Sequence, residues 1–241
     1  MTEFLQSPDF WVGLVKIIWI NIILSGDNAV VIAMAARTLP PHQQGKAVVW
    51  GSAAAVVLRV LLTVVAAKLL AMSYLQIVGG LLLLWIGVQL LGEEDEGEEG
   101  PAKHHGTLLS AIRTILIADL IMSLDNVIAV AAAAGGHWGL LIIGLAISIP
   151  LVIFGATLLV KVMERYPVII VIGAGLIGFV AGEMAWEDKA IHAWTQNFPE
   201  WTKYVCAVLG AAFVVFLGKW IARRQHARTA AGNESPDTNV P

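Results

Sequence analysis

The chain has 241 residues, of which 58% are hydrophobic and 14% are charged, and its mean hydropathy is +0.77. Soluble globular chains average about 45–50% apolar and about 25% charged residues, so this composition excludes an ordinary soluble domain. The net charge of −3 argues against a nucleic-acid partner, and a single cysteine, Cys206, excludes an internal disulfide and a cysteine-rich metal cluster.

Apolar residues come in long blocks along the chain. About 20 apolar residues span the hydrocarbon core of a bilayer, and in lipid a helix satisfies its own backbone hydrogen bonds, so the blocks predict transmembrane helices. They lack the roughly ten-residue alternating segments that are typical of barrel strands. In chain order, the seven predicted helices cover residues 10–36, 46–70, 74–92, 108–134, 138–160, 167–186 and 203–222.

Lysine and arginine are distributed unequally between the two ends of these helices. With the C-terminus in the cytoplasm, ten basic residues fall on the inner side and three on the outer side. By the positive-inside rule, this predicts a multi-pass protein of the cytoplasmic (inner) membrane with its N-terminus outside and its C-terminus cytoplasmic. The inner set is Arg37, Lys46, Lys103, Arg113, Lys161, Arg165, Lys219, Arg223, Arg224 and Arg228, and the outer set is Lys68, Lys189 and Lys203.

A polar pattern recurs in two of the predicted helices. Ser25-Gly26-Asp27-Asn28 in the first matches Ser123-Leu124-Asp125-Asn126 in the fourth, at a constant offset of 98 residues. Each half then holds three helices, so the two copies enter the membrane from opposite sides. The fold predicted is an all-α polytopic membrane protein with two inverted three-helix repeats plus one extra helix. In secondary transporters this plan places the binding site near mid-membrane, between the repeats.

The repeat defines the predicted domain organisation, in which residues 1–222 form a single transmembrane domain. Its parts are repeat one at 10–92, an acidic cytoplasmic linker at 93–107, repeat two at 108–186 and a seventh helix at 203–222. Residues 223–241 are a polar cytoplasmic tail, predicted to be disordered. The linker, with His104 and His105 beside its acidic run, could sense metal or be simply solvated. The seventh helix either completes the bundle or makes a homodimer contact.

Asp27 and Asp125 lie well inside their predicted helices. Because each carboxylate there costs about 2.5–3.5 kcal/mol on insertion scales, two at matching depth indicate a compensating cation or partner. The polar groups around them offer only oxygen ligands, which suit Mg²⁺, Ca²⁺ or Mn²⁺ rather than Zn²⁺ or Cu⁺. Gly26 could loosen the first helix and free backbone carbonyls, whereas Leu124 gives no such help in the fourth. The predicted metal ligands are Asp27, Asn28, Asp125, Asn126, Ser25, Ser123, Asp119 and Glu183.

Some of these polar groups have a structural interpretation as well. Asn21, Ser25 and Asn28 fall on one face of a continuous helix. Polar stripes of this kind also hydrogen-bond transmembrane helices to each other, which is the alternative for the two serines in particular. Glu183 is either a ligand, a proton-coupling group or a solvated residue near the outer interface.

Arg59 lies deep in the second predicted helix and needs an acidic partner. The candidates are Asp27, Asp119, Asp125 and Glu183. We expect Arg59 to pair with one of these carboxylates when the cation is absent and so to act as a counter-ion. The alternatives are that its side chain snorkels to the interface or makes only a structural contact between helices.

The doubled Ser-x-Asp-Asn motif together with Arg59 resembles the TerC family, in its YjbE-like branch, over about residues 10–220. TerC proteins belong to the LysE-type exporter superfamily, whose members are implicated in Mn²⁺ efflux, in supplying Mn²⁺ to exported proteins and in tellurite resistance. The resemblance therefore implies Mn²⁺ export, with Asp27, Asn28, Asp125 and Asn126 in the metal site. No resident cofactor is implied, because the divalent cation is the transported substrate.

Three other functions fit parts of the pattern. Paired intramembrane aspartates could form a protease dyad, but that class carries Gly-x-Gly-Asp, whereas this chain has Leu24-Ser25-Gly26-Asp27, and we expect no enzyme activity. A membrane scaffold or metal-stress component without transport is the second. The third is a transporter with Ca²⁺ or Mg²⁺ as cargo. An oxyanion fits poorly because two buried carboxylates would repel it.

Overall fold

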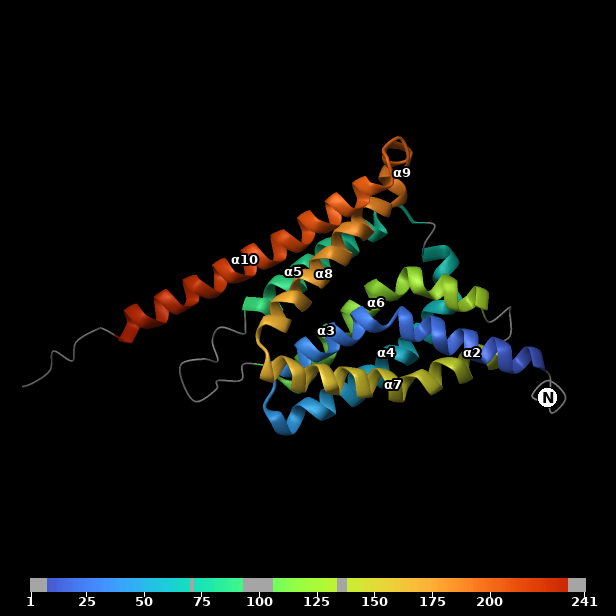
Figure 1. The fold of residues 1–241 in the computed structure, drawn as a ribbon, viewed down its shortest axis with the longest axis horizontal. Coiled ribbons are helices and arrows are strands. Elements are labelled where there is room, and N and C mark those ends of the chain that lie inside the picture. Colours follow the sequence, from blue (N-terminus) through green and yellow to red (C-terminus); the bar gives the residue numbers. More distant parts are fainter. Residues whose placement is uncertain (1–7, 70–71, 93–105, 134–137, 234–241) are drawn as a thin grey trace, which may run out of the picture.

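The structure, a computed structural model, describes residues 8–69, 72–92, 106–133 and 138–233, and within these ranges it contains helices and no strands (Figure 1). This confirms the all-α class. Most of the predicted linker and the last eight residues of the predicted tail lie outside the described residues. The helices are α2 (Pro8–Ile23), α3 (Gly26–Arg37), α4 (Pro41–Leu69), α5 (Leu75–Gly92), α6 (Leu108–Ala133), α7 (Trp138–Arg165), α8 (Val168–Glu187), α9 (Lys189–Thr195) and α10 (Trp201–Asn233).

Five helices of the described part, α4, α5, α7, α8 and α10, contain segments long and apolar enough to cross a membrane. The elements that carry the repeated polar motif are not among them. α2 and α3, which together replace the first predicted segment, are 16 and 12 residues long. α6 carries Arg113, Asp119 and Asp125 within its 26 residues. The count of seven spans therefore stays a prediction.

The first predicted segment is broken at Leu24–Ser25, where α2 ends and α3 begins at Gly26. Ser25 takes the N-cap position of α3 with φ −109° and ψ 2°, outside the helical pattern of its neighbours. The corresponding place in α6 has Leu124 where the first segment has Gly26, and α6 is continuous there. The contrast follows the expectation that glycine loosens one helix and leucine preserves the other.

The last helix differs most from its prediction. α10 continues to Asn233, past the predicted end at residue 222, through a stretch rich in arginine and alanine. These are strong helix formers, so the helix persists after its apolar part ends at Arg224. The short α9 was not predicted, because its seven residues are too few to give a periodic pattern.

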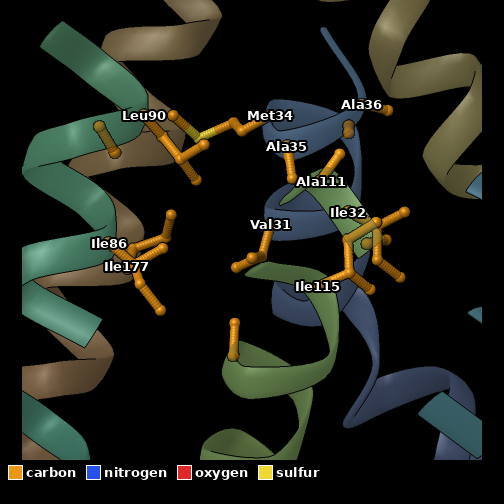
Figure 2. Packing of buried hydrophobic residues seen from close by; sticks show 14 of the residues in the cluster. Val31, Ile32, Met34, Ala35, Ala36, Ile86, Leu90, Ala111, Ile115 and Ile177 are labelled. Carbon is orange, nitrogen blue, oxygen red and sulfur yellow. The ribbon is translucent and has the colours of Figure 1, made fainter. Parts of the chain in front are cut away.

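The helices form two layers (Figure 1). α5, α8 and α10 pack on one another in one layer, while α2, α3, α4, α6 and α7 form the other. The layers join where α6 contacts α5 and α3 contacts α8. Figure 2 shows this junction, with Val31 and Met34 of α3 on one side and Ile86 and Ile177 on the other.

Glycines let α8 and α10 approach closely. A Cβ atom added at Gly178 would overlap the backbone of Gly210, and one added at Gly182 would overlap the backbone of Cys206 and Ala207. Gly178 and Gly182 are four residues apart on one face of α8. Small residues at this spacing drive helix association in lipid, where apolar surface alone gives no preference for a partner helix.

We predict that Gly182→Ala lowers the stability of the protein by about 1–3 kcal/mol, because the added methyl group forces α8 and α10 apart. Gly155→Ala is the matched control, since nothing lies within 4 Å of a Cβ at this position of α7. It should be neutral or slightly stabilising, by about 0.5–1 kcal/mol. Thermal unfolding of the two purified variants in the same detergent makes the comparison, and equal midpoints would contradict the prediction.

Candidate functional site

A buried ion pair lies between the two halves. The Arg59 Nη2 atom on α4 is 2.6 Å from Oδ1 of Asp119 on α6, and the two side chains are 5% and 4% exposed. The Arg59 Nη1 atom donates to the Ser25 hydroxyl, at 3.3 Å. The guanidinium therefore joins the helix break of the first half to the polar helix of the second.

Asp27 and Asn28 occupy the first turn of α3, immediately after the break. The Asp27 Oδ1 atom accepts from the Asn28 backbone N–H at 2.8 Å, so the carboxylate sits at the positive end of the helix dipole. Asp27 is close enough to Arg59 and Asp119 to interact electrostatically with both. Asn28 is 2% exposed, and neither atom of its amide group has a hydrogen-bond partner in the described part of the chain.

Asn126 connects the second motif to the break. Its Nδ2 atom donates to the Leu24 carbonyl at 3.1 Å, across a sequence distance of 102 residues. That carbonyl lies where α2 ends, so an amide of one motif satisfies a backbone group at the interruption of the other. Asp125 keeps its place in α6, but its side chain lies outside what the structure describes.

Two further oxygens of α6 are buried at this site. The Ser123 side chain is fully buried and Asp119 is 4% exposed. Within the described residues, neither the Ser123 hydroxyl nor the Asp119 Oδ2 atom has a hydrogen-bond partner. An unsatisfied buried polar group costs about 1–3 kcal/mol of stability, and more when it is charged. A ligand that bonds to these oxygens would remove that cost.

Glu183 does not join this group. It lies on α8 and forms an ion pair with Lys203 of α10 at 3.1 Å, with both side chains about 30% exposed. Among the described residues, no three His, Cys, Asp or Glu side chains cluster closely enough to hold a metal ion. The residues that the structure brings together are therefore Ser25, Asp27, Arg59 and Asp119, with Asn126 at the adjacent break.

The polar stripe of the first motif was inferred for a continuous helix, whereas the structure breaks that helix between α2 and α3. Ser25 lies at the N-cap position of α3, and its hydroxyl accepts a hydrogen bond from Arg59 there. The helix break, and not a position on a helical face, brings Ser25 to the site.

Sequence reasoning missed Asp188, which is 1% exposed. Its two carboxylate oxygens accept from the backbone N–H groups of Tyr74, Gln76, Ile77 and Ala190, at 2.7–3.1 Å. It therefore caps α9 and also holds the start of α5, which comes from the other half. The available signal was an aspartate directly before a helical stretch, but the α5 contact could not be read from the sequence.

Comparison with known proteins identifies the family. The profile described as the integral membrane protein TerC family matches residues 6–226. This chain belongs to the TerC family. It is 42% identical over 210 residues to the Bacillus subtilis (strain 168) membrane protein YjbE, covering 87% of this chain and 95% of YjbE.

Less similar relatives occur in Escherichia coli (strain K12). The inner membrane protein YgdQ is 26% identical, over 78% of this chain and 86% of its own length. The inner membrane protein YoaE is 25% identical over 94% of this chain, which spans 46% of YoaE. No solved structure matches the chain. The TerC-family chain is thus an integral, multi-pass membrane protein, while the orientation of its termini stays a prediction.

Proposed function

We propose that this TerC-family protein transports a hard divalent cation, Mn²⁺ in the first instance, out of the cytoplasm by alternating access. The observation that carries the proposal is the buried Arg59–Asp119 pair with Ser25, placed at a helix break between the two Asp-Asn motifs. Buried ionisable groups inside membrane helices are costly, and they commonly mark ion or substrate pathways.

The ligand chemistry favours a hard cation. Asp27, Asn28, Asp119 and Ser123 supply carboxylate, amide and hydroxyl oxygens, and Asp125 of the second motif would add another carboxylate. Oxygen sites with two carboxylates suit a divalent ion such as Mn²⁺, Mg²⁺ or Ca²⁺. The choice of Mn²⁺ and the outward direction rest on what the family implies, not on the ligands.

Arg59 acts in this proposal as an internal competitor of the cation. Its guanidinium neutralises Asp119 at 2.6 Å, so a cation that takes Asp119 as a ligand has to displace it. The Ser25 hydroxyl, which accepts from Arg59, would be released in the same step. In this proposal, cation binding is thereby coupled to movement at the break between α2 and α3.

The inverted repeat that the sequence predicts would support alternating access. In the proposed pairing, α3 corresponds to α6, α4 to α7 and α5 to α8, and each helix contacts its counterpart. Contacts between non-equivalent helices of the two repeats match as well. The second helix of repeat one, α4, packs on α6, and its counterpart α7 packs on α2 and α3. Rocking of one repeat against the other around the central site would then expose it to each side in turn. We propose proton antiport as the coupling, through the carboxylates of this site.

We predict that cells carrying the wild-type protein tolerate more external Mn²⁺ and hold less internal Mn²⁺ than cells with an empty vector. Asp27→Ala and Asp125→Ala, at equal expression, should fall to the vector level because each removes a ligand carboxylate. Glu187→Gln is the control, since Glu187 is 44% exposed and pairs only loosely, at 3.4 Å, with Lys203. Growth and cellular Mn content are measured together.

The same experiment separates the rival functions. Full protection by both alanine variants would reject the proposed site. Protection by the wild type without a lower Mn²⁺ content would instead favour a scaffold or metal-stress component, in which Arg59 and Asp119 hold helices together. Protection against Ca²⁺ rather than Mn²⁺ would keep the transporter and change its cargo.

A further inference from the structure

Ser52 of α4 is a buried polar residue that the site described above does not use. Its side chain is 1% exposed, and its hydroxyl has no hydrogen-bond partner among the described residues. Ser123 of α6 shares this property, whereas three other hydroxyls within helices do not. Thr63, Ser148 and Thr157 each donate to a backbone carbonyl three or four residues earlier, at 2.7–3.2 Å. The Ser52 hydroxyl does not make that bond, although the carbonyl four residues earlier is available to it in any helix.

Ser52 lies on the same face of α4 as Arg59. The two residues are seven positions apart, which is two helical turns and about 10 Å along the axis. α4 and α6 run parallel here, because a Cβ at Gly51 would touch Ile115 while Arg59 touches Asp119 further along both helices. Ser52 is therefore displaced from the ion pair toward the start of α4 at Pro41, the end that is predicted to be cytoplasmic.

Asn28 lies between Ser52 and the ion pair along the same direction. α3 runs antiparallel to α4, since only Thr38–Pro40 connects them, and Asn28 follows Ser25 by three residues, about 4.5 Å toward that end. On the other side of the pair, Ser123 follows Asp119 by one turn, about 6 Å. Buried polar atoms that have no hydrogen-bond partner among the described residues therefore lie on both sides of Arg59 along the axis of α4. Those of Asn28 and Ser52 are on one side, and that of Ser123 is on the other.

We propose that Ser52 lines a water-accessible approach through which the partly hydrated cation reaches Asn28 and Asp119 from the Pro41 end of α4. The inference rests on the proposed transport function. A hydrated cation explains why a fully buried hydroxyl lacks a partner among the described residues, since water would supply the hydrogen bond or the ion would coordinate the hydroxyl oxygen. Ser52 is then a pathway residue, and its hydroxyl replaces part of the hydration shell of the ion.

Silver ion, a small cation that binds thiols, tests the approach directly. The lone cysteine is first removed as Cys206→Ser, and Ser52→Cys and Ser148→Cys are each made in that background in lipid vesicles. Ser148 is the matched control, because it is fully buried on α7 but its hydroxyl bonds to the Gly144 and Leu145 carbonyls. A cysteine buried in apolar surroundings is inert, so Ser52→Cys should react about tenfold faster or more than Ser148→Cys. The residual thiol is titrated by alkylation after unfolding.

Ala55→Cys provides a second position on the same face, one turn nearer to Arg59, in case Ser52→Cys does not fold. If access is from the Pro41 end, Ala55→Cys should react no faster than Ser52→Cys and still faster than Ser148→Cys. Mn²⁺ added before silver should slow the reaction at either position. Potassium nitrate at the same ionic strength is the control.

Equal, slow reaction of the Ser52→Cys, Ala55→Cys and Ser148→Cys variants with silver would overturn the inference. If the wild type still carries Mn²⁺ in that case, the proposed function stands. Fast reaction at Ser52 that Mn²⁺ does not slow would also contradict a cation approach. Fast reaction that Mn²⁺ slows supports the inference. A wild type that carries no Mn²⁺ in a separate flux assay would mark the failure of the proposed function itself.

Discussion

Replacing Arg59 with methionine is expected to destabilise the protein by about 3–5 kcal/mol, because it leaves the Asp119 carboxylate buried without its counter-charge. Asp119→Leu should cost a similar amount by leaving the guanidinium unpaired. Both groups are about 95% buried and 2.6 Å apart, so neither can recover its hydration. For a chain of this length, the expected loss corresponds to a fall in the thermal midpoint of roughly 6–20 °C.

The double variant Arg59→Met/Asp119→Leu should recover most of that stability. Removing both charges also removes both desolvation costs, and well-packed apolar replacements of buried ion pairs are often neutral or stabilising. If the pair serves transport rather than folding, the double variant should fold well and carry no cation. That combination, stable but inactive, is the result that distinguishes a functional pair from a structural one.

The Arg59 and Asp119 single variants and the double variant form a double-mutant cycle, and the Lys203–Glu183 pair is its matched control. Its charges are 3.1 Å apart but about 30% exposed, so Lys203→Met should change stability by about 0–1 kcal/mol. Thermal unfolding of all four Arg59 and Asp119 combinations in one detergent completes the cycle. Single variants as stable as the wild type would contradict the burial of the pair, and a fully active double variant would contradict its role in transport.

Asp188→Ala is expected to destabilise the protein by about 1–4 kcal/mol, since Asp188 caps two helix starts and each lost cap costs about 0.5–2 kcal/mol. The four N–H groups that it accepts belong to α9 and to the start of α5 and its preceding turn. That turn holds Tyr74 at φ 68°, a conformation that side chains rarely adopt. Asp188, which follows α8 of the second half, therefore stabilises a strained turn between α4 and α5 of the first half.

The contribution of Asp188 should depend on pH. Burial alone would raise the pKa of Asp188, but the hydrogen bonds from four backbone N–H groups together outweigh it and hold the pKa below its usual value. The unfolded chain then binds the proton more tightly than the folded one. The stabilisation is therefore complete above the unfolded pKa of about 3.9 and is lost as the pH falls below it.

Asp188→Asn tests this sign, because it keeps the shape and removes the titration. Its thermal midpoint should lie below that of the wild type at pH 7, and the difference should shrink between about pH 4 and pH 3. Glu187→Gln, one residue earlier and 44% exposed, is the matched surface control. A difference between wild type and Asp188→Asn that stays constant down to pH 3 would contradict the account.

The parts of the fold that follow from local sequence were predictable. Long apolar blocks gave the cores of α4, α5, α7 and α8, and Gly26 indicated the break that separates α2 from α3. The end of α10 was missed because the prediction followed hydrophobicity, whereas Arg223 and the residues after it continue the helix through propensity alone.

The candidate site was predictable in its residue types but not in its pairings. Burial cost alone indicated that Arg59 needs a carboxylate, and four candidates remained until the packing of α4 on α6 placed Asp119 beside it. Glu183 was grouped with the site because it lies in a predicted helix, yet α10 brings Lys203 against it. Such choices depend on which helices are neighbours, and single-sequence patterns do not determine that.

Mn²⁺ flux into and out of sealed proteoliposomes tests the central claim most directly. Purified wild-type protein, Asp27→Ala and the Arg59→Met/Asp119→Leu double variant are reconstituted at equal density beside protein-free vesicles. We predict that the wild type moves Mn²⁺ down its gradient, faster with an opposing proton gradient, and that both variants match the empty vesicles. Wild-type flux no greater than that of empty vesicles, under any proton gradient, would contradict the proposal that this protein is a cation transporter.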